Sequence, residues 1–115
     1  MAGESVMIVM TRVANDAQAG VLIDEVLRRR LAVTACRLRV PRRAASSDAV
    51  SRGGEAERSV QIEFRTARGR QAALRSFLGR HHPESQANVT QWSIGASRTH
   101  AAWVRAETTD KQSDR

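Results

Sequence analysis

The residues with the clearest chemical potential in this chain are two adjacent histidines, His81 and His82, which precede Pro83. Imidazole nitrogens bind copper, zinc and nickel, so a histidine pair is a candidate metal site. Neighbouring histidines at a helix end can point in different directions, which makes a single site that uses both geometrically awkward. The alternative is structural, because a histidine interacts favourably with the free carbonyls at a helix C-terminus and proline stops the helix. Both interpretations stay open on these residues alone.

Other chemistry is sparse in the sequence. Cys36 is the single cysteine, so no internal disulfide can form, and a small apolar residue on a strand is the simplest interpretation of it. The chain carries no nucleophile elbow, zinc-protease, phosphate-loop or dinucleotide-binding motif. The carboxylates of Asp24, Glu25 and Glu63 form no convincing acid–base pair. We therefore expect no catalytic residues and no enzymatic activity.

Length and composition limit the classes of protein to which this chain can belong. The 115 residues suffice for one domain, and the 41% hydrophobic fraction suffices for a packed core. The longest apolar run, Val6–Met10, is far too short to span a membrane, so we expect a cytoplasmic protein. The net charge of +7 favours contact with polyanions. Only 3% of the residues are aromatic, and RNA-binding proteins that use a β-sheet need aromatic side chains on which bases stack. We therefore do not expect nucleic-acid binding.

Hydrophobic periodicity predicts the elements that must position these side chains. Strands are expected at Ser5–Thr11, Val33–Val40, Ser59–Thr66 and Asn88–Gly95, and helices at 15–30, 68–80 and 97–108. Two βαβ halves with a break between them describe a ferredoxin-like split βαβ sandwich. We predict a four-stranded antiparallel sheet with two helices on one face and a short C-terminal helix, in an α+β fold. The single domain covers residues 5–108, with a flexible loop at 41–58 and a polar tail at 109–115.

Two local patterns add detail. Asn15 followed by Gln18 indicates a capped start of the first helix. In the second strand, Cys36, Leu38 and Val40 alternate with arginines, which predicts one buried and one solvent-facing side. If the sheet face away from the helices is apolar, it is expected to be a subunit interface.

Several of these pieces together resemble the CutA family of divalent-cation tolerance proteins. The resemblance covers residues 6–40 and 59–105. The matching pieces are Ile8-Val9-Met10-Thr11, Leu31-Ala32, Val60-Gln61-Ile62, Arg65-Thr66, His81-His82-Pro83, Ile94-Gly95 and Trp103. The family's Tyr-x-Trp-x-Gly hairpin is absent, because the loop at 41–58 takes its place and the chain has no tyrosine. The chain is identified as a divergent member.

The resemblance implies a ferredoxin-like homotrimer associated with copper or another divalent cation, without a defined reaction. In the family, the His-His pair acts with a first-strand cysteine, and Met10 occupies that cysteine's position here. Carried over, the implied metal ligands are His81, His82 and Met10. His100 stands where the family has an aromatic residue, so a packing role is expected for it.

A second functional hypothesis rests on the loop at 41–58. PII-like signalling proteins are also ferredoxin-like trimers, and a long loop between their second and third strands senses nucleotide and contacts partner proteins. Arg42, Arg43 and Arg52 could meet phosphates there. The alternative is that the family's hairpin has become a disordered loop.

Overall fold

The computed structural model describes residues 4–41, 58–83 and 88–109. In chain order the elements are β1 (Glu4–Val13), α1 (Asp16–Arg28), β2 (Thr34–Pro41), β3 (Arg58–Thr66), the short 3₁₀ turn η2 (Arg68–Arg70), α3 (Gln71–His81), β4 (Val89–Ala96) and α4 (Arg98–Glu107). Every predicted strand and helix is present, with ends that differ by a few residues. The loop predicted at 41–58 lies outside the described residues, except for its two ends in β2 and β3. The tail at 109–115 lies outside them beyond Thr109.

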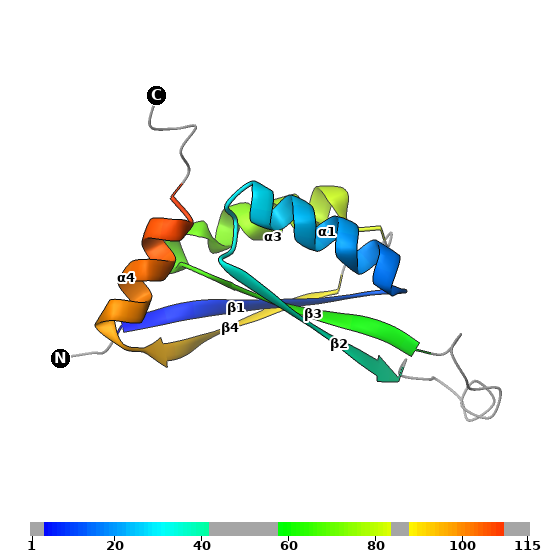
Figure 1. Cartoon of the computed structure of the whole chain (residues 1–115), viewed down its shortest axis with the longest axis horizontal. Coiled ribbons are helices and arrows are strands. Elements are labelled where there is room, and N and C mark those ends of the chain that lie inside the picture. The colour runs from blue at the N-terminus through cyan, green and yellow to red at the C-terminus, as the bar shows by residue number, and fades with distance from the viewer. Residues whose placement is uncertain (1–3, 42–57, 84–87, 110–115) are drawn as a thin grey trace.

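The four strands form one antiparallel sheet in the order β2-β3-β1-β4. Helices α1 and α3 lie side by side over one face of this sheet, and α4 stands at one end of it (Figure 1). This arrangement confirms the predicted ferredoxin-like fold. Within the described ranges, no helix is long and apolar enough to cross a membrane.

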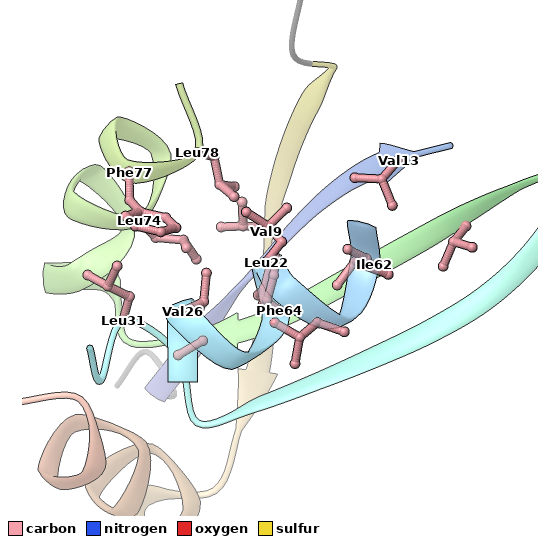
Figure 2. Close-up of a cluster of buried hydrophobic side chains, with 14 residues drawn as sticks. Val9, Val13, Leu22, Val26, Leu31, Ile62, Phe64, Leu74, Phe77 and Leu78 are labelled. Atoms are coloured by element: carbon pink, nitrogen blue, oxygen red, sulfur yellow. The ribbon is translucent and has the colours of Figure 1, made fainter. Parts of the chain in front are cut away.

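The main core lies between the sheet and helices α1 and α3. Val9 and Val13 of β1 point toward the helices, as Ile62 and Phe64 do from β3 (Figure 2). The helices contribute an apolar stripe each, with Leu22 and Val26 from α1 and Leu74, Phe77 and Leu78 from α3. The apolar residues that recur at helical spacing on α1 and α3 therefore pack against those that alternate along the strands, and together they form one core.

Within residues 4–41, 58–83 and 88–109, the opposite face of the sheet is covered only at the end where α4 lies. Side chains alternate along β1, so Val6 points away from the core that holds Val9. Val6 packs with Ala101 and Val104 of α4 in a second, smaller apolar cluster. We call this side of the sheet, away from α1 and α3, the open face. The register assigns to it Val6, Ile8, Met10, Arg12, Thr34, Cys36, Leu38, Val40, Ser59, Gln61, Glu63, Arg65, Thr90, Trp92 and Ile94.

Helix α1 begins and ends with specific backbone contacts. The Asn15 side chain accepts a 2.9 Å hydrogen bond from the Gln18 amide, which confirms the predicted cap. At the other end the amides of Arg30 and Leu31 donate to the carbonyls of Leu27 and Val26, with Arg30 at a φ of 58°. This Schellman arrangement usually employs glycine. The Arg30 guanidinium also donates to two backbone carbonyls at the end of α4, so it links the ends of the two helices.

The burial predicted for β2 is wrong in the single chain. Leu38 is 56% exposed and Cys36 is also exposed. The alternation itself is present, because Arg37 and Arg39 share the other side of the strand and both pair with Asp16 at the start of α1. The apolar set of β2 instead lies on the open face, at an edge of the sheet, where none of the described helices covers it.

Two valines of α1 test how strongly stability depends on the main core. Val26 is fully buried, whereas Val21 is 69% exposed. Val26→Ala removes two buried carbons and leaves a cavity, so we expect a loss of about 2–3 kcal/mol in the free energy of unfolding. Val21→Ala should change it by less than about 0.5 kcal/mol. Urea unfolding followed by circular dichroism measures both, and equal losses would contradict the assigned orientation of α1.

Candidate functional site

The end of α3 positions the two histidines. Leu74, Phe77 and Leu78 hold the helix against the sheet. His82 leaves the helical conformation, with φ −66° and ψ 136°, and its amide donates a 2.9 Å hydrogen bond to the Leu78 carbonyl. Pro83 follows, and the residue before a proline is restricted to extended backbone. The sequence His81-His82-Pro83 therefore ends the helix as predicted.

The His82 side chain contacts the central strand. Its Nε2 atom lies 2.8 Å from the hydroxyl oxygen of Thr11, which is fully buried. A threonine hydroxyl can donate or accept, so either histidine tautomer satisfies this bond. The bond gives the buried hydroxyl a partner and connects the C-terminal end of α3 to β1 across 71 residues of sequence.

His81 has different surroundings. Its ring stacks on Phe77, with centroids 4.5 Å apart, and it is exposed to solvent. With Pro83 it lines one side of an apolar groove of about 300 Å³, and Ala17, Gln18, Val21 and Leu22 of α1 line the other. The two imidazoles therefore meet different parts of the molecule, as their adjacency at a helix end suggested.

Met10 lies away from both histidines. It pairs across the sheet with Glu63 and Thr90 on the open face, whereas Thr11, the next residue, faces the core and contacts His82. Adjacent strand residues point to opposite faces. The structure therefore does not bring Met10 together with His82, and the three implied ligands do not fit one metal ion. In the described part of the chain, no group of three or more His, Cys, Asp or Glu side chains could hold a metal.

Sequence reasoning missed a polar cluster where α4 meets the open face. The Arg65 guanidinium lies 3.2 Å from Nε2 of His100, and the His100 ring lies 5.8 Å from that of Trp103. Arginine can only donate, so Nε2 of His100 is the acceptor of this hydrogen bond. The expected packing role of His100 thus includes a hydrogen bond. Arg65 and His100 are 35 positions apart, so no local spacing could reveal it.

The arginine clusters are partly neutralised. Glu25 accepts hydrogen bonds from Arg28 and Arg29, and these bonds hold the pKa of its carboxyl below the ordinary value. Asp16 pairs with Arg39 and lies 3.7 Å from Arg37. Phe64, the aromatic residue of β3, is fully buried in the main core and offers no stacking surface to a base.

Comparisons with known proteins show which solved structures share this architecture. No protein-family model matches the sequence, and no curated protein matches it by sequence. The sheet order and helix placement define a ferredoxin-like α+β protein. The solved structures similar to it include several CutA proteins, so the chain has the CutA fold. The resemblance seen in the sequence is thereby confirmed at the level of the fold.

Three of these structures illustrate the likeness. CutA from Synechococcus elongatus PCC7942 has a TM-score of 0.77 at 18% identity, over 95% of each chain. The divalent ion tolerance protein CutA1 from Ehrlichia chaffeensis has a TM-score of 0.72 at 12% identity, covering 94% of this chain and 99% of its own. The periplasmic divalent cation tolerance protein CutA from Archaeoglobus fulgidus has a TM-score of 0.75 at 12% identity, covering 90% and 99%.

The hydrogen bond between Thr11 and His82 can be tested by removing the hydroxyl. Thr11→Val keeps the shape of the side chain but deletes this bond in a buried setting, so we expect a loss of about 1–2 kcal/mol in unfolding free energy. Thr90→Val, at an exposed position of β4, is the matched control and should change stability by less than about 0.5 kcal/mol. Chemical denaturation compares the two, and an equally stable Thr11→Val variant would show that the bond contributes nothing.

Proposed function

We propose that this chain is a CutA-like divalent-cation tolerance protein, which acts by binding and assembly without catalysing a reaction. The observation that carries the proposal is the coverage of the fold match, which extends over 95% of both this chain and CutA from Synechococcus elongatus. Two further similar structures bear names that refer to divalent ion or cation tolerance. The sequence pieces His81-His82-Pro83 and Thr11, which resemble the family, are joined in this chain by the Thr11–His82 contact.

The protein assembles, in this proposal, as a homotrimer through the open face. Leu38 is 56% exposed and Trp92 is 40% exposed on this face, and Trp103 of the adjoining α4 is 46% exposed. Large apolar side chains exposed on the same side of a small protein indicate a surface that another protein covers. The number of copies, three, comes from the CutA resemblance.

Assembly through the open face predicts a mass of three chains in solution, and a charge placed there should lower it. Leu38→Glu introduces a carboxylate that a packed interface cannot accommodate, so we expect mainly the 12.7 kDa monomer. Val21→Glu, on the exposed side of α1, should leave the trimer intact. Multi-angle light scattering measures all three proteins. A wild-type monomer, or an equal effect of both substitutions, would contradict the proposed interface.

Divalent-cation binding at the histidines should be weak. The Nε2 atom of His82 is engaged by Thr11, so the exposed imidazole of His81 is the accessible ligand. We expect copper binding there no tighter than micromolar, by calorimetric titration with Cu²⁺. His81→Ala/His82→Ala should abolish this heat, and His100→Ala, which alters the remaining histidine, should retain it. Identical titration curves for wild type and the double variant would rule out these ligands.

The same proposal includes a cellular location and the classes of partner that we expect. We propose a cytoplasmic protein without nucleic-acid or membrane partners, although the Archaeoglobus fulgidus structure carries a periplasmic description. The partner-binding or nucleotide-sensing role considered for the loop at 41–58 falls on residues outside the described structure. Nothing in the described residues or in the comparisons supports that alternative.

A further inference from the structure

A pocket of about 270 Å³ lies where β3 leaves the sheet, at the end of the molecule that carries α4 (Figure 1). The pairing of β1 with β4 begins at Glu4, whereas its pairing with β3 begins only at Met7, opposite Thr66. After Thr66 the chain turns away from the sheet into η2. The start of β1, η2 and α4 therefore enclose a space beside the sheet, and together they line the pocket.

Two guanidinium groups from different elements line this pocket. Arg68 of η2 donates a 3.2 Å hydrogen bond to the hydroxyl of Ser5. Arg105 of α4 donates a 3.0 Å hydrogen bond to Oε1 of Glu4. These two contacts span 63 and 101 positions of sequence, so the fold alone brings the four side chains together.

The charges of the pocket do not balance. Arg105 is paired with Glu4, but within the described residues Arg68 forms no ion pair, and Ser5 offers it a neutral hydroxyl. Two guanidinium groups and one carboxylate leave one positive charge in excess. A ligand with a single negative charge would neutralise the pocket, whereas a doubly charged one would leave it negative beside Glu4.

The remaining walls are small and apolar. Ala67 and Ala101 are buried and contribute their methyl groups, and a Cβ added to Gly69 would meet no atom within 4 Å. Pockets that bury drug-sized ligands hold about 300–1,000 Å³, so this one suits a smaller molecule of a few carbon atoms. The lining therefore combines a charged side with a short apolar side.

We propose that this pocket binds a small monocarboxylate. The planar guanidinium of Arg68 matches a carboxylate, which can accept two parallel hydrogen bonds from it. Arg105 and the Ser5 hydroxyl supply further donors, and the two alanine methyl groups contact the short carbon chain. Glu4 has a double role, because it holds Arg105 at the pocket and it repels ligands that carry a second negative charge.

The pocket goes beyond the proposed divalent-cation function, because its ligand is an anion and its lining residues lie at the other end of α3 from the histidines. All of the lining residues belong to one chain, so binding does not require a trimer. On α4, Trp103 projects from the side opposite to Ala101 and Arg105, as helical spacing dictates. Subunit contacts made through Trp103 would therefore leave the pocket open.

The test is a titration of the ¹⁵N-labelled full chain with sodium butyrate, followed by NMR, with sodium chloride at equal ionic strength as the reference. We expect saturable shifts at the amides of Ser5, Gly69 and Ala101, with a Kd of about 1–10 mM, because so small a ligand has little binding energy. Inorganic phosphate, doubly charged at about pH 8, should bind at least about fivefold more weakly, since Glu4 opposes its second charge.

Three substitutions make the test specific to the pocket. Arg68→Gln should weaken butyrate binding at least about tenfold, because it removes a charged hydrogen-bond donor. Arg75→Gln is the matched control, since it removes the same charge from an exposed position of α3 outside the pocket, and it should bind as wild type does. Glu4→Gln should tighten binding about threefold or more, because its amide oxygen still accepts from Arg105 without repelling the ligand. Dispersed amide resonances elsewhere in each spectrum show that the variants are folded.

Three outcomes would overturn the proposal. Equal weakening by Arg68→Gln and Arg75→Gln would reduce the response to the general attraction of anions to a chain of net charge +7. Weaker binding by Glu4→Gln would refute the charge balance of the pocket. Tighter binding of phosphate than of butyrate would refute the preference for a single carboxylate.

Discussion

The alternation of side chains along β1 is the constraint on which the rest of the structure depends. β1 is a central strand, hydrogen-bonded to β3 on one side and to β4 on the other. Its register is continuous with both neighbours over seven residues or more. Each residue is therefore committed to one face, and a shift by one position would exchange the faces of all of them. Val9 and Val13 belong to the main core, and Val6 belongs to the cluster under α4.

Thr11 shows why the fixed orientation of each β1 side chain matters for the candidate site. Its hydroxyl is fully buried on the helix-covered side of the sheet and needs a partner, which His82 supplies. The end of α3 is thereby tied to a fixed position on β1. Thr66 of β3 meets the same need differently, because its hydroxyl donates a 2.6 Å hydrogen bond to the Leu31 carbonyl after α1. Buried threonines thus connect the sheet to the ends of both covering helices.

Much of this fold could be predicted from the sequence, because periodicity reports which residues share a face. The strands, the helices and the termination at Pro83 follow from spacing, caps and proline chemistry. Periodicity does not report whether a face is covered, which explains the error at Leu38 and Cys36. Their alternation with arginines is correct, but none of the helices and strands that the structure describes packs over β2 on that side. Contacts between distant segments could not be predicted from the sequence either. Arg65 and His100, for example, are brought together only by the packing of α4 beside β3.

The position of Met10 follows from the same reasoning. On sequence alone it could be grouped with His81 and His82 only through the family resemblance, in which a first-strand cysteine occupies its place. In the sheet, Met10 and Thr11 point to opposite sides, so a contact of His82 with Thr11 excludes one with Met10. On the open face, the direct cross-strand neighbours of Met10 are Glu63 of β3 and Thr90 of β4.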